Sequence, residues 1–139
     1  MKKAFLLVLF VACFVLMACS NYTRKFYTEI PLAEGEKITP ATEFCYFEDF
    51  PQNVPFKVLK PLVMGKSFYG SAASIRDDFA YKAKHRGGNA VANYHESQRF
   101  GFWPWRLIRP VISGDVIVIL NSRGKSCAEM GGSSYYDLD

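Results

Sequence analysis

The apolar positions of this 139-residue chain follow three different patterns in turn. An unbroken apolar run fills residues 4–17, a polar stretch without a sustained period covers residues 20–42, and short periodic segments come after it. Alternation predicts half-buried strands, whereas a period of three to four residues predicts an amphipathic helix. We therefore expect a tether over residues 19–42, one small domain over residues 43–130 and a flexible polar tail over residues 131–139.

One segment has a clear helical period. Ile75, Phe79 and Ala83 recur at four-residue spacing, which places them on one face of a helix. The pair Gly87-Gly88 then supplies the positive backbone dihedral that ends a helix. The pattern predicts a main helix over about Ser74–Arg86, with its apolar face packed on a sheet.

Four segments have the composition and alternation of strands. In the second, the apolar side chains fall on even positions, which predicts that they share one face of the sheet, and Pro61 favours an edge position or a bulge. The last is a continuous β-branched run of the kind buried on both faces. The predicted strands cover residues 44–47, 56–64, 90–96 and 116–120.

These elements predict an α+β fold in which the main helix packs on a small sheet of about four strands. The helix and the strands on either side of it are expected to form a β-α-β unit. Between the last two strands, residues 99–109 are rich in aromatic side chains and interrupted by Gly and Pro, which indicates an irregular hairpin arm.

The aromatic arm is the segment with the strongest features of a contact surface. Aromatic side chains together with Arg are enriched in interface hot spots and also suit a membrane surface. A domain of this size must equally bury its largest side chains, so a core position for the aromatic residues is as well supported. The candidate residues for partner or membrane contact are Trp103, Trp105, Arg106 and Arg109.

The first apolar run has the form of an export signal. Lys2 and Lys3 precede a run over residues 4–17 that contains no charge, Gly or Pro, and this arrangement is typical of a secretory signal peptide. A membrane-spanning helix needs about 20 apolar residues, so the run is short for a span. Residues 1–18 are therefore predicted to be a signal peptide.

The end of this run, Leu16-Met17-Ala18-Cys19, resembles the lipobox of bacterial lipoproteins. The resemblance implies that Cys19 is the first residue of the mature chain and carries a covalent lipid, and two or three acyl chains make a stable membrane anchor. For a Gram-negative source, Ser20 in place of Asp implies an outer-membrane lipoprotein that faces the periplasm. Cys13 is interpreted as an ordinary apolar residue of the signal.

The mature chain would contain two further cysteines, Cys45 and Cys127. Because the envelope outside the cytoplasmic membrane is oxidising, we predict that they form a disulfide. Two free thiols or a pair of metal ligands are the alternatives.

Charge and the remaining motifs narrow the function classes. Removing residues 1–18 lowers the net charge from +4 to +2, since 15 basic residues then face 13 acidic ones, and no basic block remains to indicate a nucleic-acid partner. No Gly-x-Ser-x-Gly motif occurs, and Asp77 and Asp78 are explained as charges in the first helical turn, so we expect no enzyme. His85 and His95 lack the spacing of a metal motif, so we expect no metal and no cofactor besides the lipid on Cys19.

The passage Lys82–Asn93, in which a helix ends in Gly-Gly-Asn-Ala-Val and leads into a strand, resembles a pattern of small α/β proteins. It is similar to the YbjQ-like heavy-metal-binding family and to the Rcs-pathway outer-membrane stress-sensor lipoproteins. The preceding Val54–Leu59 is similar to the strand that opens their domain, so the resemblance covers about residues 54–120. The Rcs lipoproteins have more than one disulfide, whereas this chain has one available cysteine pair.

Together these features lead to an expectation for function. We expect a non-enzymatic cell-envelope lipoprotein, held to the membrane by its lipid, that binds another envelope protein in a structural, assembly or stress-sensing role. A lipoprotein that binds a small ligand or a heavy metal is the first alternative, and a hydrolase accessory is the second.

Overall fold

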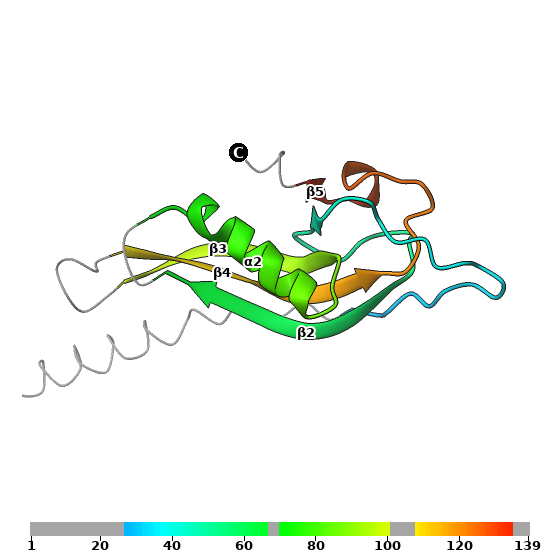
Figure 1. Cartoon of the computed structure of the whole chain (residues 1–139), viewed down its shortest axis with the longest axis horizontal. Helices are drawn as coiled ribbons and strands as arrows, with labels where there is room; N and C mark the ends of the chain where they lie inside the picture. Colours follow the sequence, from blue (N-terminus) through cyan, green and yellow to red (C-terminus); the bar gives the residue numbers. More distant parts are fainter. Residues whose placement is uncertain (1–26, 67–69, 101–107, 135–139) are drawn as a thin grey trace, which may run out of the picture.

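The computed structural model describes residues 27–66, 70–100 and 108–134 (Figure 1). Within these ranges one α-helix packs on a mixed five-stranded sheet, which confirms the α+β class and adds one strand to the predicted sheet. The elements in chain order are β1 (Cys45–Tyr46), β2 (Phe56–Gly65), α2 (Ala73–His85), β3 (Ala90–Phe100), β4 (Ile108–Ile119), the 3-10 helix η2 (Ala128–Met130) and β5 (Ser133–Ser134). No helix in the described ranges is long and apolar enough to cross a membrane.

The strands lie in the order β2-β4-β3-β1-β5. Because β4 is antiparallel to both β2 and β3, these two strands run in the same direction with β4 between them. The predicted β-α-β unit is therefore correct in that β2 and β3 are parallel. The two strands are not neighbours, however, because β4 pairs with β3 as a hairpin and lies between them. β1 adds in parallel to β3, and β5 adds in antiparallel to β1.

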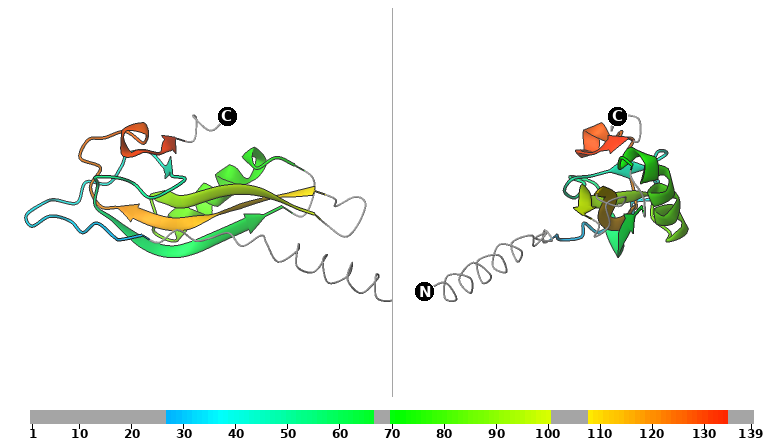
Figure 2. Two further views of the ribbon diagram at one scale, coloured as in Figure 1. Left: turned by 180° about the vertical axis from the view of Figure 1, so that it is seen from behind. Right: turned by 90° about the vertical axis from the view of Figure 1, so that its left-hand side faces the viewer.

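The two faces of the sheet carry separate apolar clusters. Figure 2 shows α2 along one face of the sheet, and loops with η2 cover the other. The helix-side cluster contains Tyr46, Leu62, Met64, Ile75, Phe79, Ala83, Val91, Ile112 and Val116. The loop-side cluster contains Cys45, Phe47, Val54, Phe56, Ala90, Ala92, Ile117, Ile119, Cys127 and Met130. The small domain therefore buries apolar side chains on both sides of a single sheet.

The main helix lies one residue earlier than predicted at each end. It spans Ala73–His85, and its predicted apolar face is buried against the sheet through Ile75, Phe79 and Ala83. Gly87 follows with φ of 85°, the left-handed conformation that the Gly pair was expected to supply.

A bulge in β2 changes the face that its side chains occupy. The register against β4 shifts directly after Val58. Phe56 and Val58 pack with the loop-side cluster, whereas Leu62 and Met64 belong to the helix-side cluster. The prediction that these residues share one face is wrong, because one extra residue moves every later side chain to the opposite face. The edge position expected for Pro61 is confirmed, since β2 is an outer strand.

A second bulge lies in β3. The register shifts between Ala92 and His95, and Asn93 has a φ of 49°. The Asn93 side chain reaches β4, where its Nδ2 donates a hydrogen bond of 2.8 Å to the buried carboxylate of Asp115. Beyond this bulge Tyr94 packs on the helix-side cluster, although Ala92 belongs to the loop-side cluster.

β4 begins at Ile108, well before the predicted strand over residues 116–120. Gly114 and Asp115, which directly precede the predicted strand, lie inside β4. A Cβ at Gly114 would lie 2.4 Å from Cγ1 of Val91, so glycine serves the close approach of two strands there and does not mark a strand start.

Part of the predicted tether, within residues 27–42, is joined to the folded unit by hydrogen bonds and an ion pair. The N–H of Phe56 donates to the carbonyl of Ile30 at 3.0 Å, and Glu36 forms an ion pair with Arg123 in which Oε1 and Nε are 2.8 Å apart. The folded unit therefore extends upstream of the predicted boundary. Backbone hydrogen bonds and ion pairs hold this polar segment, and neither produces a periodic apolar pattern.

The start of the predicted tail also belongs to the sheet. Ser133 and Ser134 pair with β1 as the edge strand β5. The neighbouring Gly132 fits closely against the core, because a Cβ there would lie 2.6 Å from the ring of Phe47. The rest of the predicted tail, residues 135–139, lies outside the described residues.

Candidate functional site

Cys45 and Cys127 form a disulfide, as predicted from the sequence. The bond joins β1 to the residue before η2, and both cysteines are buried in the loop-side cluster. Neither sulfur is available as a thiolate ligand for a metal ion. The disulfide instead fixes the loops that cover this face of the sheet.

The two histidines lie on different elements. The ring of His85, at the end of α2, lies 4.4 Å from the ring of Tyr81, measured between centroids. His95 is exposed on β3. The described part of the chain holds no group of three or more His, Cys, Asp or Glu side chains that could bind a metal ion.

Asp77 and Asp78 do not occupy the position that the sequence predicted. Because α2 begins at Ala73, both lie beyond the first turn, which contains no acidic residue. Both side chains are exposed on the helix surface.

A polar network joins α2 to β3. Arg76 is only 7% exposed, and its Nε donates a hydrogen bond of 2.9 Å to Oε1 of Glu96. The hydroxyl of Tyr94 donates to the same oxygen at 2.5 Å. One carboxylate thus receives donors from the helix and from its own strand.

The surroundings of this network lower the pKa of Glu96 and raise the pKa of Tyr94, which favours an ionised carboxylate and a protonated phenol. Burial raises the pKa of Glu96, but hydrogen bonds from Arg76 and Tyr94, with the charge of Arg76, outweigh burial and leave this pKa below its usual value. Burial and the hydrogen bond to Glu96 raise the pKa of Tyr94. A general acid or base needs a pKa near the operating pH. The network therefore fastens the helix to β3 and is poorly suited to proton transfer.

The Asn-Ala-Val passage after the helix has a structural explanation. The side chain of Asn89 donates from Nδ2 to the carbonyl of Ile119 at 3.0 Å and accepts at Oδ1 from the N–H of the same residue at 2.7 Å. It thereby pairs with β4 as a strand backbone would. A Cβ at the preceding Gly88 would lie 2.2 Å from Cγ1 of Val116, so glycine allows this close connection.

Replacing Asn89 by Ala should lower the free energy of unfolding by about 1–3 kcal/mol, because both backbone groups of the buried Ile119 lose their partner. Urea denaturation measures the change. Asn89→Asp is the matched variant: it keeps an acceptor for the N–H but places a second oxygen against the carbonyl, so it should not restore full stability. Wild-type stability in both variants would contradict this role.

β3 and β4 form a long antiparallel hairpin. They are paired from Ala90 opposite Ile117 to Phe100 opposite Ile108, and Figure 1 shows the hairpin continuing past the start of α2. The predicted irregular arm over residues 99–109 is therefore regular strand at both ends. Residues 99–100 pair with residues 108–109, although Gly101 and Pro104 between them led the sequence pattern to predict an irregular segment.

Three of the predicted contact residues, Trp103, Trp105 and Arg106, lie outside the described residues, as does Cys19. The fourth, Arg109, is half-buried on β4 directly opposite the exposed Arg99 of β3. Like charges directly opposite each other on neighbouring strands are destabilising. The two arginines thus face each other one pair before the end of the hairpin.

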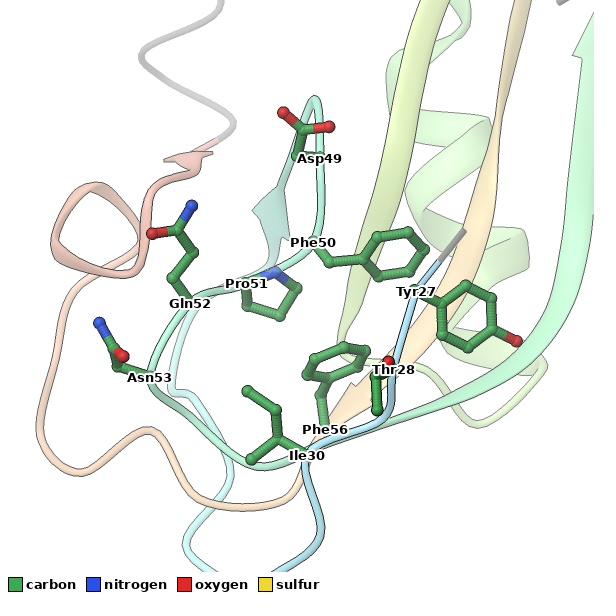
Figure 3. A pocket seen from close by; sticks show the side chains of 9 residues that line it. All are labelled: Tyr27, Thr28, Ile30, Asp49, Phe50, Pro51, Gln52, Asn53 and Phe56. Carbon is green, nitrogen blue, oxygen red and sulfur yellow. The ribbon is translucent and has the colours of Figure 1, made fainter. Parts of the chain in front are cut away.

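A surface hollow of about 480 Å³, which we call the aromatic hollow, lies between residues 27–30 and the loop after β1. Figure 3 shows Tyr27, Phe50 and Phe56 together on one side, with Gln52 and Asn53 on the opposite side. The remaining lining residues are Thr28, Ile30, Asp49 and Pro51.

The three rings of the hollow form one contiguous group. The ring centroids of Tyr27 and Phe50 are 4.6 Å apart, and those of Phe50 and Phe56 are 5.6 Å apart with nearly parallel planes. Phe56 is buried, whereas Tyr27 is 39% exposed. Solvent exposure therefore increases from Phe56, in the loop-side cluster, to Tyr27 at the surface.

Sequence reasoning missed this hollow. Tyr27 falls in the predicted tether and residues 50–53 fall between two predicted strands, and the bridge between Ile30 and Phe56 brings these two segments together. The one local signal is the presence of Phe50 in a segment otherwise typical of a solvated turn.

The resemblance of residues 54–120 to the YbjQ-like and Rcs-pathway groups stays a prediction. The geometry of Gly88 and Asn89 explains its motif by packing and hydrogen bonding. Comparison with protein-family models, with curated proteins and with solved structures found no match for this chain.

Proposed function

We propose that this chain is a non-enzymatic lipoprotein of the bacterial cell envelope, anchored by lipid on Cys19, that binds another envelope protein through the end of the β3–β4 hairpin. The lipobox-like sequence and the signal-like run before it support the anchor. The disulfide between Cys45 and Cys127 supports a compartment in which disulfides persist.

The observation that carries the partner-binding proposal is the position of Arg99 and Arg109. They lie opposite each other at the end of a regular two-stranded arm, where two like charges cost stability. An acidic surface on a partner would offset that repulsion, and the Trp-Pro-Trp sequence over residues 103–105 would supply aromatic anchors of the kind found at hot spots. The proposed partner surface is therefore acidic at its rim and apolar at its centre.

The distance from the anchor to the folded unit supports a protein held close to its membrane. Cys19 and Tyr27 are eight residues apart, and an extended chain spans at most about 3.3–3.6 Å per residue, or about 28 Å over this stretch. Tyr27 itself packs against Phe50. The anchored domain would thus reach partners close to the membrane surface.

Replacing Trp103 and Trp105 together by Ala should weaken association with the partner by more than about tenfold, because hot-spot aromatic truncations cost about 2 kcal/mol or more. A photo-crosslinking amino acid at position 103, irradiated in living cells, should give a discrete crosslinked band with one envelope protein. Mass spectrometry of that band then provides the partner for the affinity measurement.

Tyr81→Ala is the matched control, since Tyr81 is an exposed aromatic on α2, away from the arm. It should leave the crosslink and the affinity unchanged. The double Trp variant should unfold thermally within a few degrees of the wild type. A large loss of stability would place the tryptophans in the core, and crosslinks to lipid alone would replace the protein partner with the membrane.

A further inference from the structure

We propose that the hairpin binds its partner by strand addition. An extended segment of the partner protein pairs with the outer edge of β3 over residues 95–99 and places a carboxylate beside Arg99. The inference rests on the proposed function and specifies how that contact is made.

β1 and the loop after it cover only the first part of the outer edge of β3. The N–H groups of Asn93 and Tyr94 donate to the carbonyls of Asp49 and Phe47 at 3.1 and 2.9 Å. Beyond Tyr94 no described strand pairs with this edge, and residues 95–99 are exposed or half-buried. In the described part of the chain the edge is therefore open.

The register shows which backbone groups face outward there. The carbonyl of Pro110 accepts a hydrogen bond from the residue directly after β2, so the backbone groups of the next residue, Val111, face β3. Ser97 lies opposite Val111 and pairs with it. Because backbone groups alternate in direction along a strand, the N–H and carbonyl groups of Glu96 and Gln98 point away from β4.

The other long edge of the sheet, formed by β2, is guarded against pairing. The N–H of Val58 donates to the carboxylate of Glu29 at 2.8 Å. Pro61 has no N–H, and its carbonyl accepts a hydrogen bond of 3.0 Å from Arg86. Soluble proteins use prolines, bulges and covering segments to keep edge strands from pairing with other chains. Residues 95–99 carry no such guard in the described structure, so β3 is the edge that can accept a strand.

The charges along this edge indicate an acidic segment. On the helix side, the carboxylate of Glu96 already accepts a hydrogen bond from Arg76, and Gln98 is neutral. On the other face Arg99 is exposed and lies opposite Arg109. A carboxylate on an added strand beside Arg99 would form a favourable cross-strand pair and offset the repulsion between the two arginines.

A second copy of this chain would not supply that carboxylate from its own β3. The side chains on the same face as Arg99 over residues 95–99 are those of His95 and Ser97, and neither is acidic. In an antiparallel pairing of two β3 edges, Arg99 would lie beside one of these residues or beside Arg99 of the other copy. The expected occupant is therefore an extended acidic segment of a different protein.

Hydrogen exchange of the lipidated mature chain in phospholipid nanodiscs, followed by NMR, tests whether the edge is open. After correction for intrinsic rates, the amides of Glu96 and Gln98 should exchange at least about tenfold faster than those of His95 and Ser97, which donate to β4. Equal protection of the two sets would overturn the proposal.

Gln98→Pro tests the strand addition itself, because it removes an outward N–H and leaves the pairing with β4 in place. It should reduce the partner crosslink from position 103 about tenfold, since a carbonyl of the added strand loses its donor. Val63→Pro is the matched control: Val63 is exposed on β2, and its backbone also faces outward. This control should leave the crosslink unchanged, and thermal melts of both variants should agree within a few degrees of the wild type.

Arg99→Glu separates binding from folding. It places an opposite charge beside Arg109, so the hairpin should be at least as stable as in the wild type, whereas the acidic segment is repelled and the crosslink should fall about tenfold. Lys57→Glu makes the same charge change at an exposed position of β2 and should have no effect on the crosslink.

The outcomes distinguish this inference from the proposed function. Wild-type crosslinking in Gln98→Pro would overturn strand addition while leaving the partner contact at the hairpin end in place. A crosslink between two copies of the chain would overturn the choice of a different protein. Absence of any protein crosslink from position 103 in the wild type would overturn the proposed function and strand addition with it.

Discussion

Replacing Cys45 and Cys127 together by Ala is expected to lower the free energy of unfolding by about 4–5 kcal/mol. The cysteines are 82 residues apart in sequence, and in the chain-entropy model a crosslink across a loop of this length restricts the unfolded chain by about 4.5 kcal/mol. Small domains are typically stable by only 5–15 kcal/mol. The variant should therefore be partly unfolded at 37 °C, and urea denaturation followed by circular dichroism measures the change.

Reduction of the wild type provides the internal control. In excess dithiothreitol the wild-type midpoint should fall to that of the double Ala variant, whose own midpoint should not respond to the reductant. Thiol counting on denatured, unreduced protein should find neither Cys45 nor Cys127 reactive. A double variant within about 1 kcal/mol of the wild type would show that loop-side packing holds these segments without the bond.

The disulfide and the helix could be predicted for opposite reasons. The helix could be predicted from local sequence, because the four-residue spacing of Ile75, Phe79 and Ala83 is enough to place them on one helical face. The disulfide is a long-range contact, yet Cys45 and Cys127 are the only cysteines after the lipobox-like sequence and therefore the only pair to consider in the proposed compartment. Neither prediction required knowledge of the strand order.

The faces of β2 and β3 could not be predicted in the same way. Alternation assigns a face only while the register is continuous, and each strand contains a bulge. The bulge at Asn93 is stabilised across the sheet by Asp115, which is 22 positions away in sequence. A local pattern therefore located four of the five strands and gave the wrong face for β2 beyond Val58.

The aromatic hollow was beyond sequence reasoning for a related reason. Its residues come from a polar leading segment and from a turn, and neither segment has a period. The two segments are brought together by the backbone bridge between Ile30 and Phe56. Backbone hydrogen bonds of this kind leave no pattern in the side-chain sequence. The hairpin arm was found because its aromatic residues are contiguous in sequence, whereas those of the hollow are dispersed over residues 27–56.

Replacing Cys19 by Ala is expected to move the protein from the membrane fraction to the soluble fraction, or to retain it as the uncleaved precursor. Diacylation contributes about 0.8 kcal/mol for each buried methylene, which makes a durable anchor, and the Ala side chain has no thiol to carry the lipid. The measurement is fractionation with immunoblotting, combined with metabolic labelling by an alkyne-tagged palmitate. Cys13→Ala is the matched control, since it removes a thiol from the same segment without changing the lipobox-like sequence Leu16-Met17-Ala18-Cys19. It should leave labelling and fractionation unchanged. Palmitate labelling of Cys19→Ala at the wild-type level would refute the lipid anchor, whereas an unlabelled precursor that stays in the membrane fraction through its uncleaved apolar run over residues 4–17 would not.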